Sequence, residues 1–358
     1  MKKTLIYLAV AAMFTACSSD IDYTEPDNIT DEITFTVGNI GMPSKIASRA
    51  EHEHIDWNPR VHANTLGVFG FCNDGTIFDN QKVTYNSTGS RWEYSPTKYW
   101  KDYANKNSDF FGYMVEADEL PSDASLTSSG NSYTLSFPAS ISNPILTSAD
   151  NTPLICHAPQ HRTTEKFAIP FEMDQTLTGY CLQFQLGEKM DNIRDFVIKS
   201  VKIYGNNLPT GGTVSRTYTF DGSTWTAGNV TWTSVTKSNV ASVSAISIPI
   251  SLEYITVNTH TDWVKWGGSE LTDGAFYAIP SESFTPTIEV TYDVYSDAST
   301  MTRKDVKSTI ILNATNFSNL VAATTGEIHP IRIKIVPDYL YVLSDDDHAT
   351  GVLVVDNK

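Results

Sequence analysis

The chain lacks the short motifs by which many enzymes are recognised. Its 358 residues contain no nucleophile elbow, P-loop, dinucleotide fingerprint or HExxH sequence. Those motifs serve acyl transfer, phosphate binding, cofactor binding and zinc hydrolysis, so we expect neither an enzyme nor a cofactor. One enzymatic alternative stays open, a hydrolase on a β-sandwich, because the paired carboxylates of glycoside hydrolysis are brought together only by the fold.

Positive charge is also scarce. The chain has 25 Lys and Arg residues against 41 Asp and Glu residues, a formal net charge of −16, and its basic residues form no cluster. Proteins that bind nucleic acid or anionic lipid surfaces concentrate Lys and Arg on one face. The composition therefore argues against both kinds of partner.

Cysteine is rare and irregularly spaced. Cys72, Cys156 and Cys181 remain once Cys17 near the N-terminus is set aside. An odd number of cysteines without a CxxC spacing predicts neither a disulfide framework nor a zinc site. A single bridge among the three cannot be assigned from the sequence.

Long apolar runs are missing, apart from a short one at the N-terminus. Residues 5–14 are apolar, Lys2 and Lys3 precede them, and small residues follow before Cys17. A basic start, a short apolar stretch and a small-residue junction are typical of a secretory signal peptide, which we place at residues 1–16. The run is too short for a transmembrane helix, which needs about 20 apolar residues.

The junction Phe14-Thr15-Ala16-Cys17 resembles a bacterial lipobox, with Phe14 where leucine is usual. The resemblance implies a lipoprotein with acyl chains such as palmitate on Cys17, and firm anchoring needs more than one chain. We therefore expect a surface-exposed lipoprotein of the cell outer membrane, with residues 17–49 forming an acidic tether and an N-terminal strand. The alternative is an ordinary secretory peptide followed by a coincidental cysteine.

The dominant periodicity of the remaining chain is two. Alternating apolar residues predict strands with one buried and one solvated face. The clearest such segments are residues 33–37, 180–186, 246–252, 288–294 and 331–335. Helical spacing is weak, since residues 193–201 fit a helix and a strand equally well. The expected fold class is all-β, with two β-sandwich domains at residues 50–168 and 169–358.

Four blocks, in order along nearly the whole exported chain, resemble the fimbrillin family, the subunits of type V pili. They are Ser48-Arg49-Ala50 with Trp57 and Leu66-Gly67-Val68-Phe69; Lys98-Tyr99-Trp100 with Asp109-Phe110-Phe111-Gly112-Tyr113; Phe276-Tyr277-Ala278-Ile279-Pro280; and Gly326 ahead of residues 331–335. Two positions depart from the family pattern, Lys101 where proline is usual and Gly112 where alanine is usual.

The resemblance implies two tandem transthyretin-like β-sandwich domains in a structural subunit of a fimbrium (pilus) that contributes to cell adhesion. It also implies donor-strand exchange. A protease cuts between Arg49 and Ala50, an N-terminal strand leaves, and a strand from another copy or a related fimbrial subunit fills the groove. The residues agree with this scheme, because strand-forming residues 33–37 are joined to Arg49 by a segment with glycines, proline and polar residues. Such a strand could be removed without disturbing the domain behind it.

The C-terminal tail, residues 338–358, is expected to supply the donor strand. Pro337 interrupts the preceding strand because proline offers no N–H, and two strand-like pieces follow it. Leu340 and Val342 in the first piece, and Val352 and Val354 in the second, alternate as groove-filling side chains should. The alternative is a terminal hairpin that folds onto its own domain.

Three further groups have a functional and a structural interpretation. His52 and His54 have the spacing of metal ligands on one face of a strand, but a solvated loop is favoured. Residues 345–348 are three aspartates and a histidine, for which a charged turn is favoured. No metal site is therefore expected. Trp263 and Trp266 could stack on a sugar. In that case the chain would be a non-polymerising surface lipoprotein that binds glycan or a host protein, which is the alternative function.

Overall fold

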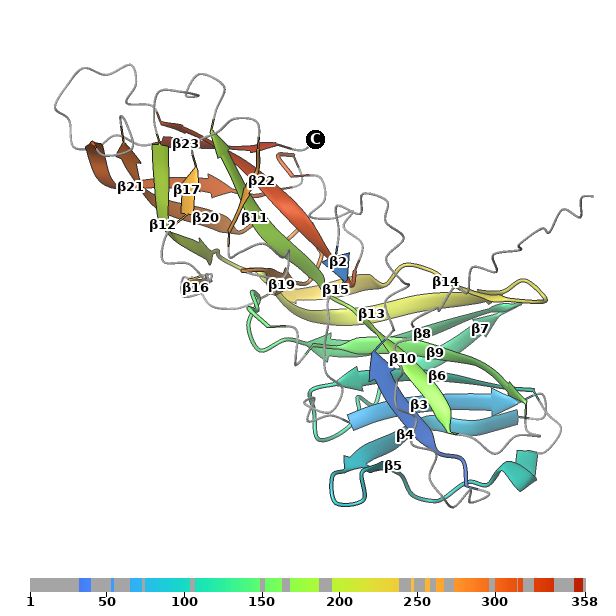
Figure 1. Ribbon diagram of the computed structural model, residues 1–358. Helices are drawn as coiled ribbons and strands as arrows, with labels where there is room; N and C mark the ends of the chain where they lie inside the picture. Colours follow the sequence, from blue (N-terminus) through green and yellow to red (C-terminus); the bar gives the residue numbers. More distant parts are fainter. Residues whose placement is uncertain are drawn as a thin grey trace, which may run out of the picture.

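The computed structural model describes residues 32–39, 53–54, 65–72, 75–103, 107–148, 152–162, 168–186, 195–237, 246–247, 255–257, 262–266, 274–295, 300–313, 315–317, 325–337 and 351–356. Within these ranges the regular structure is β-strand, apart from the short 3-10 helix Trp100–Tyr103. No helix in these ranges is long and apolar enough to cross a membrane. The all-β prediction is confirmed, and Figure 1 shows the strands gathered into layered sheets.

A seven-stranded sheet in the order β1-β10-β9-β6-β3-β4-β5 forms the first layer. Its strands are β1 (Phe35–Asn39), β3 (Thr65–Cys72), β4 (Gly75–Asn86), β5 (Arg91–Glu93), β6 (Asn107–Val115), β9 (Leu154–Arg162) and β10 (Ile169–Gln175). Neighbours are antiparallel except β1 and β10, which run parallel. The first strand in sequence therefore pairs with the last strand of this sheet, at one end of the strand order.

A five-stranded sheet packs on one face of the first layer. Its strands are β7 (Ser125–Ser129), β8 (Ser132–Ser140), β13 (Pro209–Phe220), β14 (Trp225–Ala227) and β15 (Thr231–Lys237). The core between the two sheets includes Phe111 of β6 together with Phe137, Val214 and Tyr218. The adjacent residue Phe110 belongs to a different buried cluster, because successive side chains of a strand point to opposite faces.

Two glycines of β3 let aromatic rings lie across the strand. A Cβ atom on Gly67 would meet the ring of Tyr113 at 2.4 Å, and one on Gly70 would meet the ring of Phe110 at 2.8 Å. Each ring belongs to the residue directly opposite its glycine on β6. Glycine occupies these two positions because a larger side chain would collide with the ring on the neighbouring strand.

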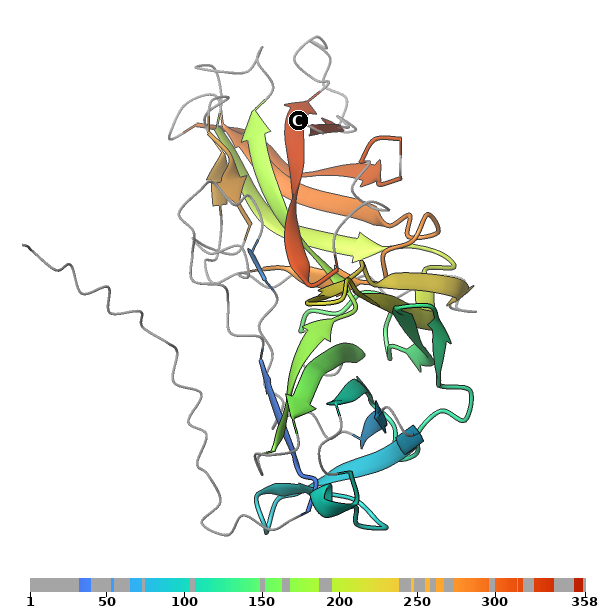
Figure 2. The ribbon, with the colours of Figure 1, turned by 90° about the vertical axis from the view of Figure 1, so that its right-hand side faces the viewer.

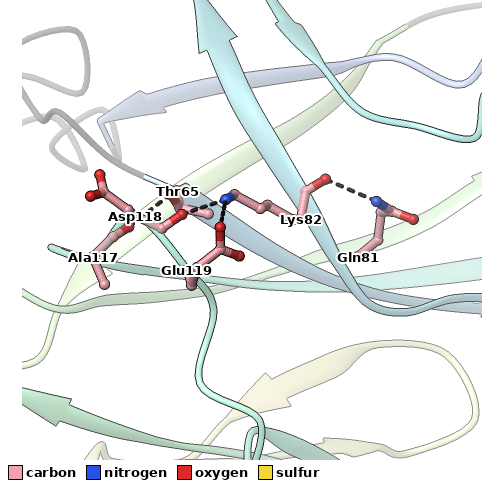
Figure 3. A network of polar contacts seen from close by, with 6 residues as sticks. All are labelled: Thr65, Gln81, Lys82, Ala117, Asp118 and Glu119. Atoms are coloured by element: carbon pink, nitrogen blue, oxygen red, sulfur yellow. Dashed lines mark hydrogen bonds and ion pairs between the residues drawn. The ribbon is translucent and has the colours of Figure 1, made fainter.

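The connection that leaves β6 for the second sheet is tied back to the first (Figure 3). The Thr65 hydroxyl donates to the carbonyl of Ala117 at 2.8 Å. The Lys82 ammonium contacts the carbonyl of Asp118 and lies 2.9 Å from the Glu119 carboxylate. The Lys82–Glu119 pair is exposed, and such surface pairs contribute little stability. The contacts fix where the chain crosses from one sheet to the other.

The rest of the chain builds a second pair of sheets. The six-stranded sheet contains β2 (Glu53–His54), β11 (Thr178–Leu186), β18 (Val264–Lys265), β19 (Phe276–Ala278), β22 (Glu327–Pro337) and β23 (Gly351–Asp356). The five-stranded sheet contains β12 (Asp195–Tyr204), β16 (Ile246–Ser247), β17 (Ile255–Val257), β20 (Thr287–Tyr295) and β21 (Met301–Ile311). β11 and β22 run parallel, and Leu182, Phe184, Tyr292 and Ile333 share the core between the two sheets.

The structure adds detail that the periodicity did not contain. Residues 195–201, part of the segment with ambiguous spacing, belong to the strand β12. Alternation in β11 predicted one solvated face, but Gln183 and Gln185 are buried as well, so that expectation is wrong for this strand. β11 lies between two neighbours, and its second face packs in a separate buried cluster that includes Cys181 and Ile328.

Strand pairing crosses the expected domain boundary between residues 168 and 169. β10 pairs with β9 and β1, and β13 pairs with β8, so segments from both sides of the boundary share sheets. The boundary as a division into folding units stays a prediction.

Candidate functional site

β1 is the end strand of the seven-stranded sheet. Together with the three residues before it, β1 lies between β10 and the segment that follows β5. On one side β1 pairs with β10 in a register that places Phe35 opposite Ile169, and the Ile169 N–H donates to the Thr34 carbonyl at 2.8 Å. On the other side the Ile33 N–H donates to the carbonyl of Lys98, just after β5, at 2.9 Å. Residues 32–39 thus fill a gap between β10 and the segment that follows β5.

The side chains of this segment alternate between the core and the surface. Ile33 is fully buried and Phe35 is 4% exposed, whereas Thr34 and Thr36 are half-buried. Val37 is partly buried and packs against the same apolar cluster. The alternation expected over residues 33–37 is confirmed, and its apolar side faces inward.

The ring of Phe35 lies among three other rings. Its centroid is 5.6 Å from that of Phe78, 5.7 Å from that of Tyr94 and 5.6 Å from that of Phe171, and the Phe171 ring is nearly parallel to it. Packing of this kind adds to the free energy of burying the aromatic surface. We call the space occupied by residues 33–37 the β1 groove. It lies between β10 and residues 94–99, with Phe78, Tyr94 and Phe171 around its centre.

Tyr94 holds the backbone of the strand as well as its side chain. Its hydroxyl donates to the carbonyl of Ile33 at 2.7 Å and accepts from the Lys98 N–H at 3.3 Å. Burial raises the pKa of the Tyr94 phenol well above its ordinary value. The hydroxyl therefore stays protonated and remains a donor to whichever strand lies in the groove.

Replacing Tyr94 with phenylalanine should loosen β1 while leaving the ring packing in place. Loss of one hydrogen bond to a buried carbonyl should cost about 1 kcal/mol. Hydrogen exchange at residues 33–39 should then be roughly fivefold faster. Tyr85→Phe on β4 is the control, because the Tyr85 ring packs on Trp92 and not on Phe35. Equal exchange in both variants would show that the Tyr94 hydroxyl does not hold the strand.

The expected cleavage site follows β1 in sequence. Arg49 and Ala50 lie outside the described residues, as does Cys17. The described chain resumes at β2, which pairs with β22 in the other pair of sheets. In Figure 2 the two blue strands, β1 and β2, lie along different sandwiches. A cut between residues 49 and 50 would therefore separate a strand of one sandwich from a strand of the other.

The expected donor strand is described in part. Leu340 and Val342 lie outside the described residues, while β23 pairs antiparallel with β22, so that Val352 is opposite Val336 and Val354 is opposite Lys334. In a single chain, this part of the tail therefore adds to its own sheet. Donation to a second copy stays a prediction.

The remaining candidates do not form a site among the described residues. Trp266 is 1% exposed and packs edge-on against Phe184, so it has no face open to a sugar. Trp263 lies beneath the Arg332 guanidinium at 5.6 Å. No group of three or more metal-ligating side chains occurs in the described part of the chain, and His52 and residues 345–348 lie outside it.

The three cysteines for which no disulfide framework is expected are buried. Cys72, Cys156 and Cys181 form no disulfide, and burial raises the pKa of the Cys156 thiol. A buried neutral thiol behaves as a small apolar side chain rather than as a nucleophile.

The sequence alone did not single out the residues around the β1 groove. Tyr94 lies four residues before the Lys98-Tyr99-Trp100 block, and Phe78 and Phe171 lie far from each other along the chain. Nothing in the local sequence indicates that Phe78, Tyr94 and Phe171 meet around Phe35. The signal that was present is the alternation of residues 33–37, which requires a partner surface of matching period.

Comparison with known proteins gives structural likeness only. No family model matches the chain, and no curated protein matches it. A fimbrial protein from Bacteroides vulgatus matches with 15% identity and a TM-score of 0.39, covering 91% of this chain and 99% of that one. A candidate cell adhesion protein from Bacteroides eggerthii matches with 12% identity and a TM-score of 0.41, covering 90% and 95%.

A third solved structure, a fimbrial assembly protein from Parabacteroides distasonis, matches with 13% identity and a TM-score of 0.34, covering 76% of this chain and 84% of that one. The solved structures similar to this chain thus include fimbrial and cell adhesion proteins. At these TM-scores the superposition assigns no role to any residue here.

Proposed function

We propose that this protein is a structural subunit of a cell-surface fimbria, assembled by proteolytic maturation and donor-strand exchange and contributing to adhesion. The observation that supports it is β1. A strand that precedes a candidate cleavage site fills a groove with backbone partners on both sides and an aromatic centre. Its removal would leave both unpaired backbone groups and an apolar slot, the two features that an incoming strand satisfies.

In this proposal, maturation begins with the precursor anchored in the outer membrane. Lipid on Cys17 would anchor the precursor in the outer membrane, and cleavage between Arg49 and Ala50 would release the tether together with β1. Ile33 and Phe35 would then leave the core, which uncovers apolar surface worth about 1.5–3 kcal/mol for each side chain. A strand from another copy or a related subunit would recover that free energy.

The topology suits two tandem domains of one kind, which we propose to be transthyretin-like. In the first pair of sheets β1 runs parallel to β10, and in the second β11 runs parallel to β22. Each pair of sheets thus contains one parallel strand pair among antiparallel neighbours. β1 is bound mainly through its ladder with β10, so it could be exchanged without reordering the sheet.

Cleavage with an arginine-specific protease tests this function. Purified protein with Cys17→Ser should form ladders that resist SDS without heating, because exchanged strands complete the sheets. Arg49→Ala should stay monomeric, while the control Arg60→Ala, which removes the next arginine in the sequence, should assemble normally. Protein that is cut at Arg49 yet stays monomeric would contradict assembly by strand exchange.

A second function is favoured by the position of β23. Because this strand pairs with β22 of its own chain, a single molecule completes its own sheet, as a non-polymerising surface lipoprotein would. Such a protein would bind glycan or a host protein at the surface. In the same experiment it would lose its N-terminus and form no ladder.

A further inference from the structure

The β1 groove has slots of different chemistry along its length. The slot of Ile33 is closed and holds an aliphatic side chain, since Ile33 is fully buried. The slot of Phe35 is aromatic, with three rings within 5.7 Å of its centroid. The slot of Val37 is only partly covered. A strand that fits must therefore present an aliphatic residue at one end, an aromatic ring in the middle and a residue of less restricted size at the other end, each two positions apart.

Alternate residues of a strand share a face, so the C-terminal tail can present either of two sets of residues, which we call its two phases. Only one phase offers such a triplet. Residues 338–358 contain two aromatic rings apart from the histidine, Tyr339 and Tyr341. One phase consists of Tyr339, Tyr341 and Leu343 and has an aromatic residue at its centre. The other consists of Leu340, Val342 and Ser344 and has no aromatic residue. The second strand-like piece has no aromatic residue. A shift of one residue turns every side chain of a strand to its other face, so the two phases exclude each other.

We infer that the β1 groove accepts Tyr339, Tyr341 and Leu343 from the tail of a second copy, with Tyr341 in the aromatic slot. This inference rests on the proposed function and reverses the phase expected from Leu340 and Val342. Leu343, an aliphatic residue like Ile33, fits the closed slot, and Tyr339 fits the partly covered slot, where its hydroxyl reaches water. This order runs opposite to Ile33, Phe35 and Val37, so the incoming strand lies antiparallel to β10.

A labelled peptide of residues 336–346, present in excess while full-length Cys17→Ser protein is cut at Arg49, tests the inference. The peptide should stay on the cut monomer in unheated SDS gels and should suppress the ladder. Tyr341→Ala in the peptide should weaken suppression at least about tenfold, the loss expected when a central aromatic anchor is truncated. Tyr341→Phe should retain it. Uncut protein, whose groove is filled by β1, should bind no peptide.

Further peptide variants separate the two phases and the two directions. Leu340→Ala and Val342→Ala should suppress the ladder as the unmodified peptide does, and Leu343→Ala should lose more than Tyr339→Ala. Loss with Leu340→Ala or Val342→Ala, but not with Tyr341→Ala, would overturn the phase. A larger loss with Tyr339→Ala than with Leu343→Ala would overturn the direction.

A second peptide, residues 31–39, distinguishes failure of the inference from failure of the proposed function. If it binds the cut protein and the tail peptide does not, the groove is functional and its occupant is another strand, which overturns the inference alone. If neither peptide binds and no ladder forms, the groove is not an acceptor and the proposed function fails with it.

Discussion

Replacing Phe35 with alanine should release β1 from its groove while the rest of the first sandwich stays folded. The ring is 4% exposed and is surrounded by three aromatic rings. Truncating such a side chain costs about 3–5 kcal/mol, since the transfer free energy is lost and a cavity remains. Hydrogen exchange at residues 33–39 should therefore accelerate about 100-fold or more, up to the limit set by residual pairing.

Two comparisons test whether the effect of Phe35→Ala is confined to β1. Thr36→Ala, on the half-buried side of the same strand opposite Pro170, should leave exchange nearly unchanged. After cleavage at Arg49, the Phe35→Ala and wild-type proteins are identical in sequence and should unfold at the same denaturant concentration. A Phe35→Ala precursor that loses global stability instead of opening locally would show that β1 is a structural strand of the fold and not an exchangeable one.

The sequence predicted the strands well and their partners poorly. Alternation marked the segment of Ile33, Phe35 and Val37 because burial on one face imposes a period of two. The same signal could not show that Phe35 lies against Phe78 and Phe171, since these contacts join residues far apart in the chain. A local pattern of residues also cannot show where a strand lies in the order of the sheet.

Two details show the physical limit of such patterns. Gln183 and Gln185 are polar and alternate with apolar residues, which predicted a solvated face, yet both are buried. The polar ends are accommodated by neighbours such as Arg332, whose Nε–H donates to the side-chain Oε1 of Gln183 at 3.4 Å. Trp266 was a candidate sugar platform by composition, but it packs in the core instead. In each case the residue type is compatible with both environments, and only the fold decides between them.

Deleting residues 338–358 should leave a folded, secreted monomer that accepts a donor strand but cannot extend a fibre. The tail contributes β23, which lies at the edge of β22, while the opposite side of β22 remains paired with β11. Ile331, Ile333 and Ile335 are fully buried in a core built from two sheets. Loss of one edge strand should therefore lower stability without unfolding this sandwich. Mixed with full-length protein and cut at Arg49, the truncated chain should terminate fibres and shorten the SDS-resistant ladder.

A shorter deletion, residues 351–358, separates the two strand-like pieces of the tail. It removes β23 but keeps Tyr339, Tyr341 and Leu343, so fibres should still extend if the first piece is the donor. Extension by the chain that lacks residues 338–358 would show that the tail donates nothing. If both truncated chains fail to fold, the tail belongs to its own sandwich, because an edge strand that a core cannot lose is not available for exchange.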